Sequence, residues 1–262
     1  MDLDLSGRHA LVCGGSQGIG RAVAMELALL GADVTLLARN QQALQRAVDA
    51  LPRVAAGQAH GWIGADVGET VALAASVQAL VATRPVHVLV NNSGGPPGGP
   101  VATAGVDEFL TAFRNHLLAN QALVGAVLDG MRAAGWGRIV NVVSTSVKEP
   151  IANLGVSNTV RGAVAAWSKT LSRELGGDGI TVNNVLPGYT RTQRLEQILD
   201  DRSAASGRER DQVAAGMLAS VPAGRFAEAA EIAAAVAFLA SPAAGYINGV
   251  SLAVDGGRMH SI

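Results

Sequence analysis

Short runs of β-branched and aliphatic residues recur along the chain and alternate with longer stretches of helical spacing. Apolar residues repeat at helical intervals over residues 18–32 and 69–84, which predicts amphipathic helices there. The short apolar runs predict strands. They cover residues 9–14, 33–39, 60–67, 86–92, 137–144, 179–188 and 249–257.

Strands that are apolar almost throughout and alternate with helices are typical of a parallel sheet covered on both faces. No repeat, low-complexity tract or linker divides the chain, so we expect one domain over residues 1–262. The loop "NNSGGPPGGPVATAG" at 91–105 directly follows a predicted strand. Ligands bind at this edge of open α/β sheets. A surface loop would have the same composition.

The composition and net charge of the chain limit the kinds of molecule that it is expected to bind. A formal net charge of -1 without long runs of like charge disfavours nucleic acid and anionic membranes, so we expect a small-molecule partner. The single cysteine, Cys13, excludes an internal disulfide and suits a reducing compartment. The first residues, "MDLDLSGRHALV", are acidic where a signal peptide is basic, and no apolar run reaches about 18 residues. We therefore expect a cytoplasmic protein that does not span a membrane.

A glycine-rich turn links the first predicted strand to the first helix. Gly14, Gly18 and Gly20 have the spacing G-x-x-x-G-x-G. Their lack of side chains would let a pyrophosphate approach the positive end of the helix that begins near Ile19. A tight strand-to-helix turn also needs glycine, but the position after the first strand favours dinucleotide binding.

The residues at the end of the second predicted strand indicate whether NAD or NADP is the preferred cofactor. Ala38 and Arg39 stand where an acidic residue would bind the ribose hydroxyls of NAD. A guanidinium suits a phosphate, so Arg39 favours NADP, with NAD still possible. Arg39 could instead stack on the adenine or lie in solvent. Asp66 could accept a hydrogen bond from the adenine amine or could cap the next helix before Glu69.

Several motifs together resemble the short-chain dehydrogenase/reductase family over nearly the full length, with the greatest likeness to 3-oxoacyl-carrier-protein reductases. They are "CGGSQGIG", "NNSGG", "GRIVNVVS", "GITVNNVLPGYTRT" and "PAGRFAEAAEIAAAVAFLASPAAGYINGVSLAVDGG". The resemblance implies a Rossmann-like, doubly wound parallel sheet in a three-layer α/β/α sandwich. It also implies hydride transfer between a nicotinamide and a carbonyl or alcohol, a homotetramer or homodimer, and a variable substrate lid around residues 190–218. No metal site is implied.

The residues and the resemblance together assign a set of positions to the cofactor; beside this set Cys13 replaces the usual Thr, and within it Ser93 replaces the usual Ala. The set comprises Gly14, Ser16, Gly18, Ile19, Gly20, Arg39, Asp66, Val67, Asn92, Ser93, Gly94, Arg161, Pro187, Gly188 and Thr192.

The catalytic positions of the family depart from its pattern in this chain. Ser144 matches the family's serine, but the tyrosine and lysine positions, 13 and 17 residues further on, hold Ser157 and Arg161. The position of the family's asparagine, 28 residues before Ser144, holds His116. A shift of one residue in that helix would restore Asn115.

These replacements change the chemistry available. A phenol beside an ammonium can be tuned into a general acid, whereas an aliphatic hydroxyl cannot be tuned that far. Arg161 stays protonated, so it supplies charge and donors without relaying a proton. Lys148, Tyr189 and His116 are candidate substitutes for the acid; each could equally be a solvated, packing or backbone-bonded residue.

Three functions remain open. The first is an NADP-dependent oxidoreductase of a carbonyl or secondary alcohol with a rearranged catalytic set, of which a variant reduces a conjugated C=C bond in an enoyl or dienoyl thioester. The second is an NADP-binding sensor or scaffold without turnover. The third, a structural homo-oligomer subunit, fits poorly with the glycine turn. Because the glycine turn and the core pattern are intact, a rebuilt active site is favoured over a lost one.

Overall fold

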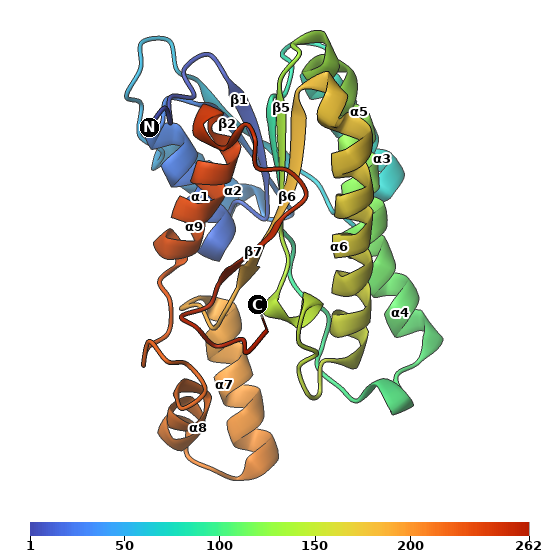
Figure 1. Ribbon diagram of the computed structural model, residues 1–262, viewed down its shortest axis with the longest axis vertical. Helices are drawn as coiled ribbons and strands as arrows, with labels where there is room; N and C mark the ends of the chain where they lie inside the picture. Colours follow the sequence, from blue (N-terminus) through green and yellow to red (C-terminus); the bar gives the residue numbers. More distant parts are fainter. Residues whose placement is uncertain (262) are drawn as a thin grey trace.

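Seven parallel strands form one sheet in the order β3-β2-β1-β4-β5-β6-β7 in a computed structural model that describes residues 1–261 (Figure 1). Each strand lies within one of the runs predicted from the sequence. The strands are β1 (His9–Cys13), β2 (Asp33–Ala38), β3 (His60–Gly64), β4 (Val88–Asn91), β5 (Gly137–Val142), β6 (Ile180–Pro187) and β7 (Ser251–Val254).

Helices cover both faces of the sheet, so the predicted Rossmann-like, three-layer fold is confirmed. α1, α2 and α9 pack on one face, and α3, α5 and α6 on the other (Figure 1). The α-helices are α1 (Gly18–Leu29), α2 (Gln41–Asp49), α3 (Thr70–Val81), α4 (Val106–Phe113), α5 (Ala119–Ala133), α6 (Gly155–Leu175), α7 (Gln193–Ser206), α8 (Arg210–Leu218) and α9 (Ala229–Ala240). The shorter helical elements are η1 (Val101–Thr103), η2 (Arg114–Leu118), η3 (Thr145–Val147), η4 (Gly176–Asp178) and η5 (Pro242–Ala244).

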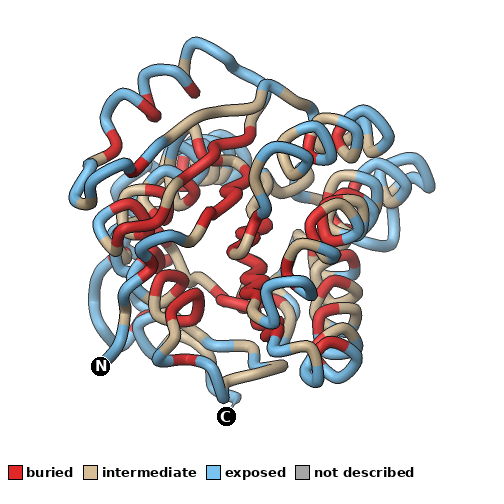
Figure 2. The backbone as a smooth tube through the Cα atoms, turned by 90° about the horizontal axis from the view of Figure 1, so that it is seen from above, coloured by how far each residue is buried: buried red, intermediate tan, exposed pale blue. Residues whose placement is uncertain are grey.

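The core explains why the strands are apolar throughout. β1, β4 and β5 are buried along their whole length between the helical layers. In Figure 2 the buried backbone, drawn in red, lies inside the molecule, and the exposed backbone, in pale blue, lies around it. The segment expected to form a lid forms α7 and α8, which pack together beyond the carboxyl ends of the strands (Figure 1). Across residues 1–261, no helix combines the length and apolarity that a membrane crossing requires.

Buried asparagines cross-link four strands near the carboxyl edge of the sheet. Asn91 donates to Asn141 at 2.8 Å, Asn141 donates to Asn184 at 3.0 Å, and Asn184 donates to Ser251 at 3.1 Å. Each pair stands opposite in the strand register. Because a buried amide without partners is costly, this ladder favours one register and so fixes where β4, β5 and β6 end.

The opposite edge of the sheet carries neutral histidines. His9 is buried; its Nδ1 donates to the Pro85 carbonyl at 3.1 Å, so its Nε2 accepts from the Thr35 hydroxyl at 2.8 Å. Burial and then the charge of Arg84 lower the pKa of His9 to about 4. Burial also lowers the pKa of His60 and His87. These rings are therefore uncharged in the folded protein at neutral pH.

We predict that acid destabilises the fold through His9. In the unfolded chain its pKa is near 6.5, so the unfolded state binds more protons below that pH and stability falls until the folded pKa is reached. Between pH 7 and pH 5 His9 alone should remove about 2 kcal/mol from the free energy of unfolding. Urea denaturation of the wild type and His9→Gln at both pH values measures this.

The variant should lose less stability on acidification than the wild type by about that amount. The matched control is His260→Gln, which makes the same substitution at an exposed position and leaves His9 in place. Equal losses in all three proteins would contradict the assignment to His9.

Candidate active and cofactor site

The glycines of the turn between β1 and α1 let backbone segments, and a ligand, come close to the backbone of the turn. Gly14 has a φ of +60°, and a Cβ on Gly20 would lie only 2.2 Å from the Gly14 carbonyl oxygen. Gln17 precedes α1 without a side-chain hydrogen bond to the helix, whose first turn holds no acidic residue. The free N–H groups at this helix end therefore fit an anion such as a cofactor pyrophosphate.

Loops from the ends of other strands meet this turn. Asn92, after β4, donates to the Cys13 carbonyl at 3.3 Å. Thr192, at the start of α7, has its methyl group 3.4 Å from where a Cβ on Gly18 would lie. The structure thus brings residues assigned to the cofactor from three separate segments to one edge of the sheet.

The end that would hold the adenosine is more open. Arg39 is exposed, and its Nη1 lies 3.8 Å from Oδ2 of Asp66. Asp66 accepts the N–H of Gly68 at 2.9 Å, and Glu69 is the residue that precedes the first turn of α3. The alternative that Asp66 caps this helix is therefore wrong, because its carboxylate closes a turn before the helix begins. Val67 is partly buried against the core.

The serines predicted for catalysis lie on segments that pack together, the loop after β5 and the first turn of α6. Ser144 Oγ accepts the N–H of Ser146 at 3.1 Å. Ser157 is buried, and its Oγ accepts from Nε of Arg161 at 3.3 Å. Because both oxygens are occupied as acceptors, each hydroxyl hydrogen is free to be donated elsewhere.

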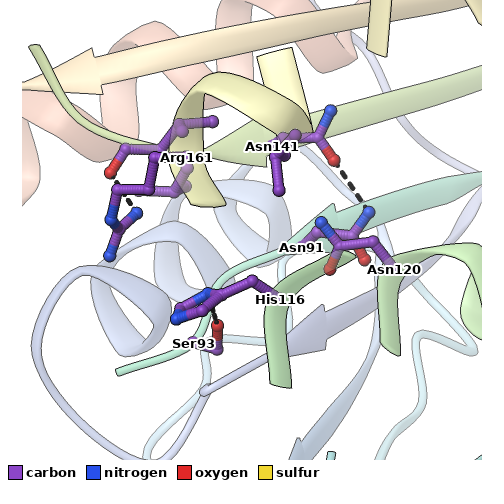
Figure 3. Close-up of a pocket in the computed structure, with 9 residues that line it drawn as sticks. Asn91, Ser93, His116, Asn120, Asn141 and Arg161 are labelled. Carbon is purple, nitrogen blue, oxygen red and sulfur yellow. Dashed lines mark hydrogen bonds between the residues drawn. The ribbon is translucent and has the colours of Figure 1, made fainter. Parts of the chain in front are cut away.

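Arg161 ties α6 to the end of β5. Its Nη1 donates to the carbonyl of Val143, the residue before Ser144 (Figure 3). Among residues 1–261 no carboxylate forms an ion pair with this guanidinium. Burial, and then the charge of Arg194, lowers the pKa of Arg161 to about 10, so it remains a cation at neutral pH.

His116 belongs to η2, a π-helical turn between α4 and α5, which is a common place for functional residues. Its Nδ1 is bonded to the Ser93 hydroxyl at 2.8 Å (Figure 3). Burial and then Arg161 lower its pKa to about 4. Asn115 instead has Oδ1 2.7 Å from where a Cβ on Gly68 would lie. His116, and not Asn115, therefore faces the cleft.

Figure 3 shows this cleft between β4, β5, α5 and α6. It is lined by Asn91, Ser93, His116, Asn120, Asn141, Val142, Val143, Arg161 and Val164. Sequence reasoning named Ser93 and His116 separately but missed their bond and the three lining asparagines. For Asn91 and Asn141 the available signal was an asparagine within an otherwise apolar strand, whereas Asn120 lies on α5 and had no such signal.

The other candidate acids, Lys148 and Tyr189, are not among the residues that line this cleft, and neither are Ser144 and Ser157. Lys148 is exposed just after η3. The Tyr189 ring packs edge-to-face on Phe226 at 6.2 Å, and the Arg258 guanidinium carbon lies 4.5 Å from its centroid. Tyr189 lines a second hollow with residues of the 221–231 segment and of the C-terminal tail.

Burial raises the pKa of Cys13 to about 12, so this thiol is unreactive.

Comparisons with known proteins agree with this geometry. The family profile described as enoyl-(acyl carrier protein) reductase matches residues 14–259. The short-chain reductase protein NovJ of Streptomyces niveus is 37% identical over 95% of this chain and 93% of its own. The 3-oxoacyl-[acyl-carrier-protein] reductase FabG of Vibrio cholerae is 35% identical over 97% and 98%. L-sorbose reductase from Gluconobacter frateurii, solved with NADPH and L-sorbose, superimposes with a TM-score of 0.92 at 28% identity over both full chains.

We predict that Gly20→Ala damages the cofactor turn. The new methyl group would overlap the Gly14 carbonyl, and relief of such overpacking typically costs about 1–3 kcal/mol. Thermal unfolding should show lower stability, and NADPH titration followed by nicotinamide fluorescence should show binding weakened at least roughly tenfold, about 1.4 kcal/mol.

The matched control is Gly125→Ala in α5, where a Cβ meets no atom within 4 Å. This variant should bind NADPH like the wild type and be no less stable, since alanine is the better helix former. Unimpaired binding by Gly20→Ala would contradict the close approach at this turn.

Proposed function

The chain belongs to the short-chain dehydrogenase/reductase family, and on that premise we propose that it reduces a carbonyl with NADPH through a catalytic set rebuilt around Ser144, Ser157 and Arg161. The protein is an NAD(P)-dependent oxidoreductase of carbonyl and alcohol substrates. The bound cofactor supplies the hydride. What the chain supplies is the position of the carbonyl and the stabilisation of the charge that forms on its oxygen.

The observation that carries the proposal is the hydrogen bonding of the two serines. Ser144 Oγ accepts from Ser146 and Ser157 Oγ accepts from Arg161, so both hydroxyls can donate to a carbonyl oxygen. Donors fixed before reaction stabilise a developing oxyanion at little reorganisation cost. Arg161, half-buried beside Ser157, adds a permanent positive charge, and its partial removal from water strengthens the effect of that charge.

The proton balance differs from that of a tyrosine-based site. Arg161 keeps its protons at neutral pH, and His116, with its pKa of about 4, is uncharged there. We infer that His116 is a positioning residue held by Ser93 and that the alkoxide takes its proton from water. Lys148 and Tyr189 are outside this set, because the first is exposed and the second is packed between Phe226 and Arg258.

The same observation favours a second candidate, reduction of a C=C bond conjugated to a thioester carbonyl. Hydride addition there leaves an enolate, whose oxygen needs donors and positive charge but no acid. The two serine hydroxyls and Arg161 provide these, and the proton reaches carbon from solvent. The matching family profile is described as an enoyl-(acyl carrier protein) reductase.

We predict that Ser157→Ala and Ser144→Ala each lower kcat for NADPH oxidation by roughly 10²–10³-fold, the usual loss on removal of an oxyanion donor. Cofactor absorbance is followed with ketones, 3-oxoacyl thioesters and enoyl thioesters. Thr159→Ala removes an exposed hydroxyl from the same helix and should keep the wild-type rate. A wild type that binds NADPH but oxidises it with no panel member would support the sensor function instead.

We further propose that Arg39 gives the preference for NADP by binding the 2′-phosphate. Its side chain is exposed beside Asp66 at the end of β2, near the N-terminus of α2. Arg39→Ala should weaken NADPH roughly 10- to 100-fold, as expected for a lost charge-assisted contact, and leave NADH within about twofold. Fluorescence titrations with both cofactors measure this. Equal weakening of both would assign Arg39 to the adenine instead.

The homotetramer or homodimer expected from the resemblance stays a prediction for this chain. Light scattering of the purified protein, with and without NADPH, gives its mass in solution directly.

A further inference from the structure

Two guanidiniums converge on the loop between β4 and α4 from different helices. Nη2 of Arg161, on α6, lies 3.3 Å from where a Cβ on Gly95 would be. Nη2 of Arg194, on α7, donates to the carbonyl of Pro96 at 3.1 Å. Gly95 and Pro96 are consecutive, so the two cations lie close to each other across the loop.

Neither cation has an acidic partner in the part of the chain that the structure describes. Carboxylates do lie near α7, but Glu196 and Asp200 pair with Arg210, and Glu228 pairs with Arg191. Burial, and then the charge of Arg194, lowers the pKa of Arg161, as expected for two cations that lie near each other. Two like charges close together without a counter-ion attract an anion.

The loop indicates which part of the cleft this anion would occupy. At its start Asn92 contacts the glycine turn through the Cys13 carbonyl. At its end Gly99 donates to the Asn153 carbonyl, just before α6 and Ser157. Arg194 contacts the loop at Pro96, between these two points. The pyrophosphate already has donors at the glycine turn and the N-terminus of α1.

We propose that Arg161 and Arg194 together bind a carboxylate of the substrate, which makes the substrate an oxo acid. This proposal rests on the proposed function for its reaction. The carbonyl carbon of the oxo acid takes a hydride from NADPH and its oxygen takes a proton from water, so the products are a hydroxy acid and NADP⁺. The carboxylate is unchanged. Nε and Nη1 of Arg161 already donate to Ser157 and Val143, and Nη2 of Arg194 donates to Pro96, so the donors left for it are Nη2 of Arg161 and the Nε and Nη1 of Arg194.

The test measures binding without turnover. Protein loaded with NADP⁺ cannot reduce an oxo acid, so calorimetry can measure the affinity of this dead-end complex. The probes are 2-oxobutanoate, 3-oxobutanoate and 4-oxopentanoate, each against its methyl ester. The wild type should bind at least one acid more tightly than its ester. Arg194→Met should weaken that acid roughly 10- to 100-fold and change the ester far less.

Arg194→Lys should restore part of the preference for the acid, because it restores the charge without the planar fork. Arg208→Met removes an exposed cation from the same helical region and should keep the wild-type preference, which controls for net charge. Binding of NADP⁺ itself is measured for every variant. Circular dichroism checks that each variant is folded.

Two results would overturn the proposal. One is equal affinity of every acid and its ester in the wild type. The other is a loss of NADP⁺ affinity in Arg194→Met that accounts for the whole effect, since the anion would then belong to the cofactor. Failure of the proposed function is a separate result, because NADPH oxidation can be absent while the dead-end complex still shows the dependence on Arg194.

Discussion

The bond from Arg161 to the Val143 carbonyl is the constraint on which the site depends. It fixes the first turns of α6 against the end of β5, and it sets Ser157 beside the loop that carries Ser144. A guanidinium held away from water without a carboxylate is unfavourable by itself. The hydrogen bonds from Arg161 to the Val143 carbonyl and to Ser157 offset part of the free-energy cost of removing the guanidinium from water. An anionic or polar ligand in the cleft would offset more, so binding and stability are coupled at this residue.

The asparagine ladder gives this bond a rigid support. Asn91, Asn141 and Asn184 stand opposite one another on three neighbouring strands; Asn91 and Asn141 lie at or next to the ends of β4 and β5, before the loops that carry Ser93 and Ser144. A slip of one residue in any strand would bury unpaired amides, so register is fixed where the site needs it. The strand register therefore fixes where the loops begin, whatever residues the loops contain. Asn91 and Asn141 also line the cleft, so the same residues order the sheet and shape the site.

The sequence predicts the strands and the glycine turn because both depend on local patterns. A strand buried on both faces must be apolar, and a strand-to-helix turn of this geometry needs glycine at Gly14 and Gly20. The bond between Ser93 and His116 could not be predicted in this way, because it joins separate segments. The choice between Asn115 and His116 required the π-helical turn, whose extra residue alters which side chain faces the cleft. The convergence of Arg161 and Arg194 likewise depends on where α7 packs.

The proposed site would offer a hydroxyl and a guanidinium where the family resemblance implies a phenol and an ammonium, which would change what the site contributes to a hydride transfer. A phenol beside an ammonium lowers the barrier partly by giving up a proton. A hydroxyl that accepts from a guanidinium can only donate a hydrogen bond, so its contribution is electrostatic. That contribution is worth most when the negative charge remains on oxygen for some time, as in an enolate, and less when the alkoxide must be protonated at once. On the proposed function, the half-buried Arg161 cation therefore favours substrates whose negative charge stays on oxygen.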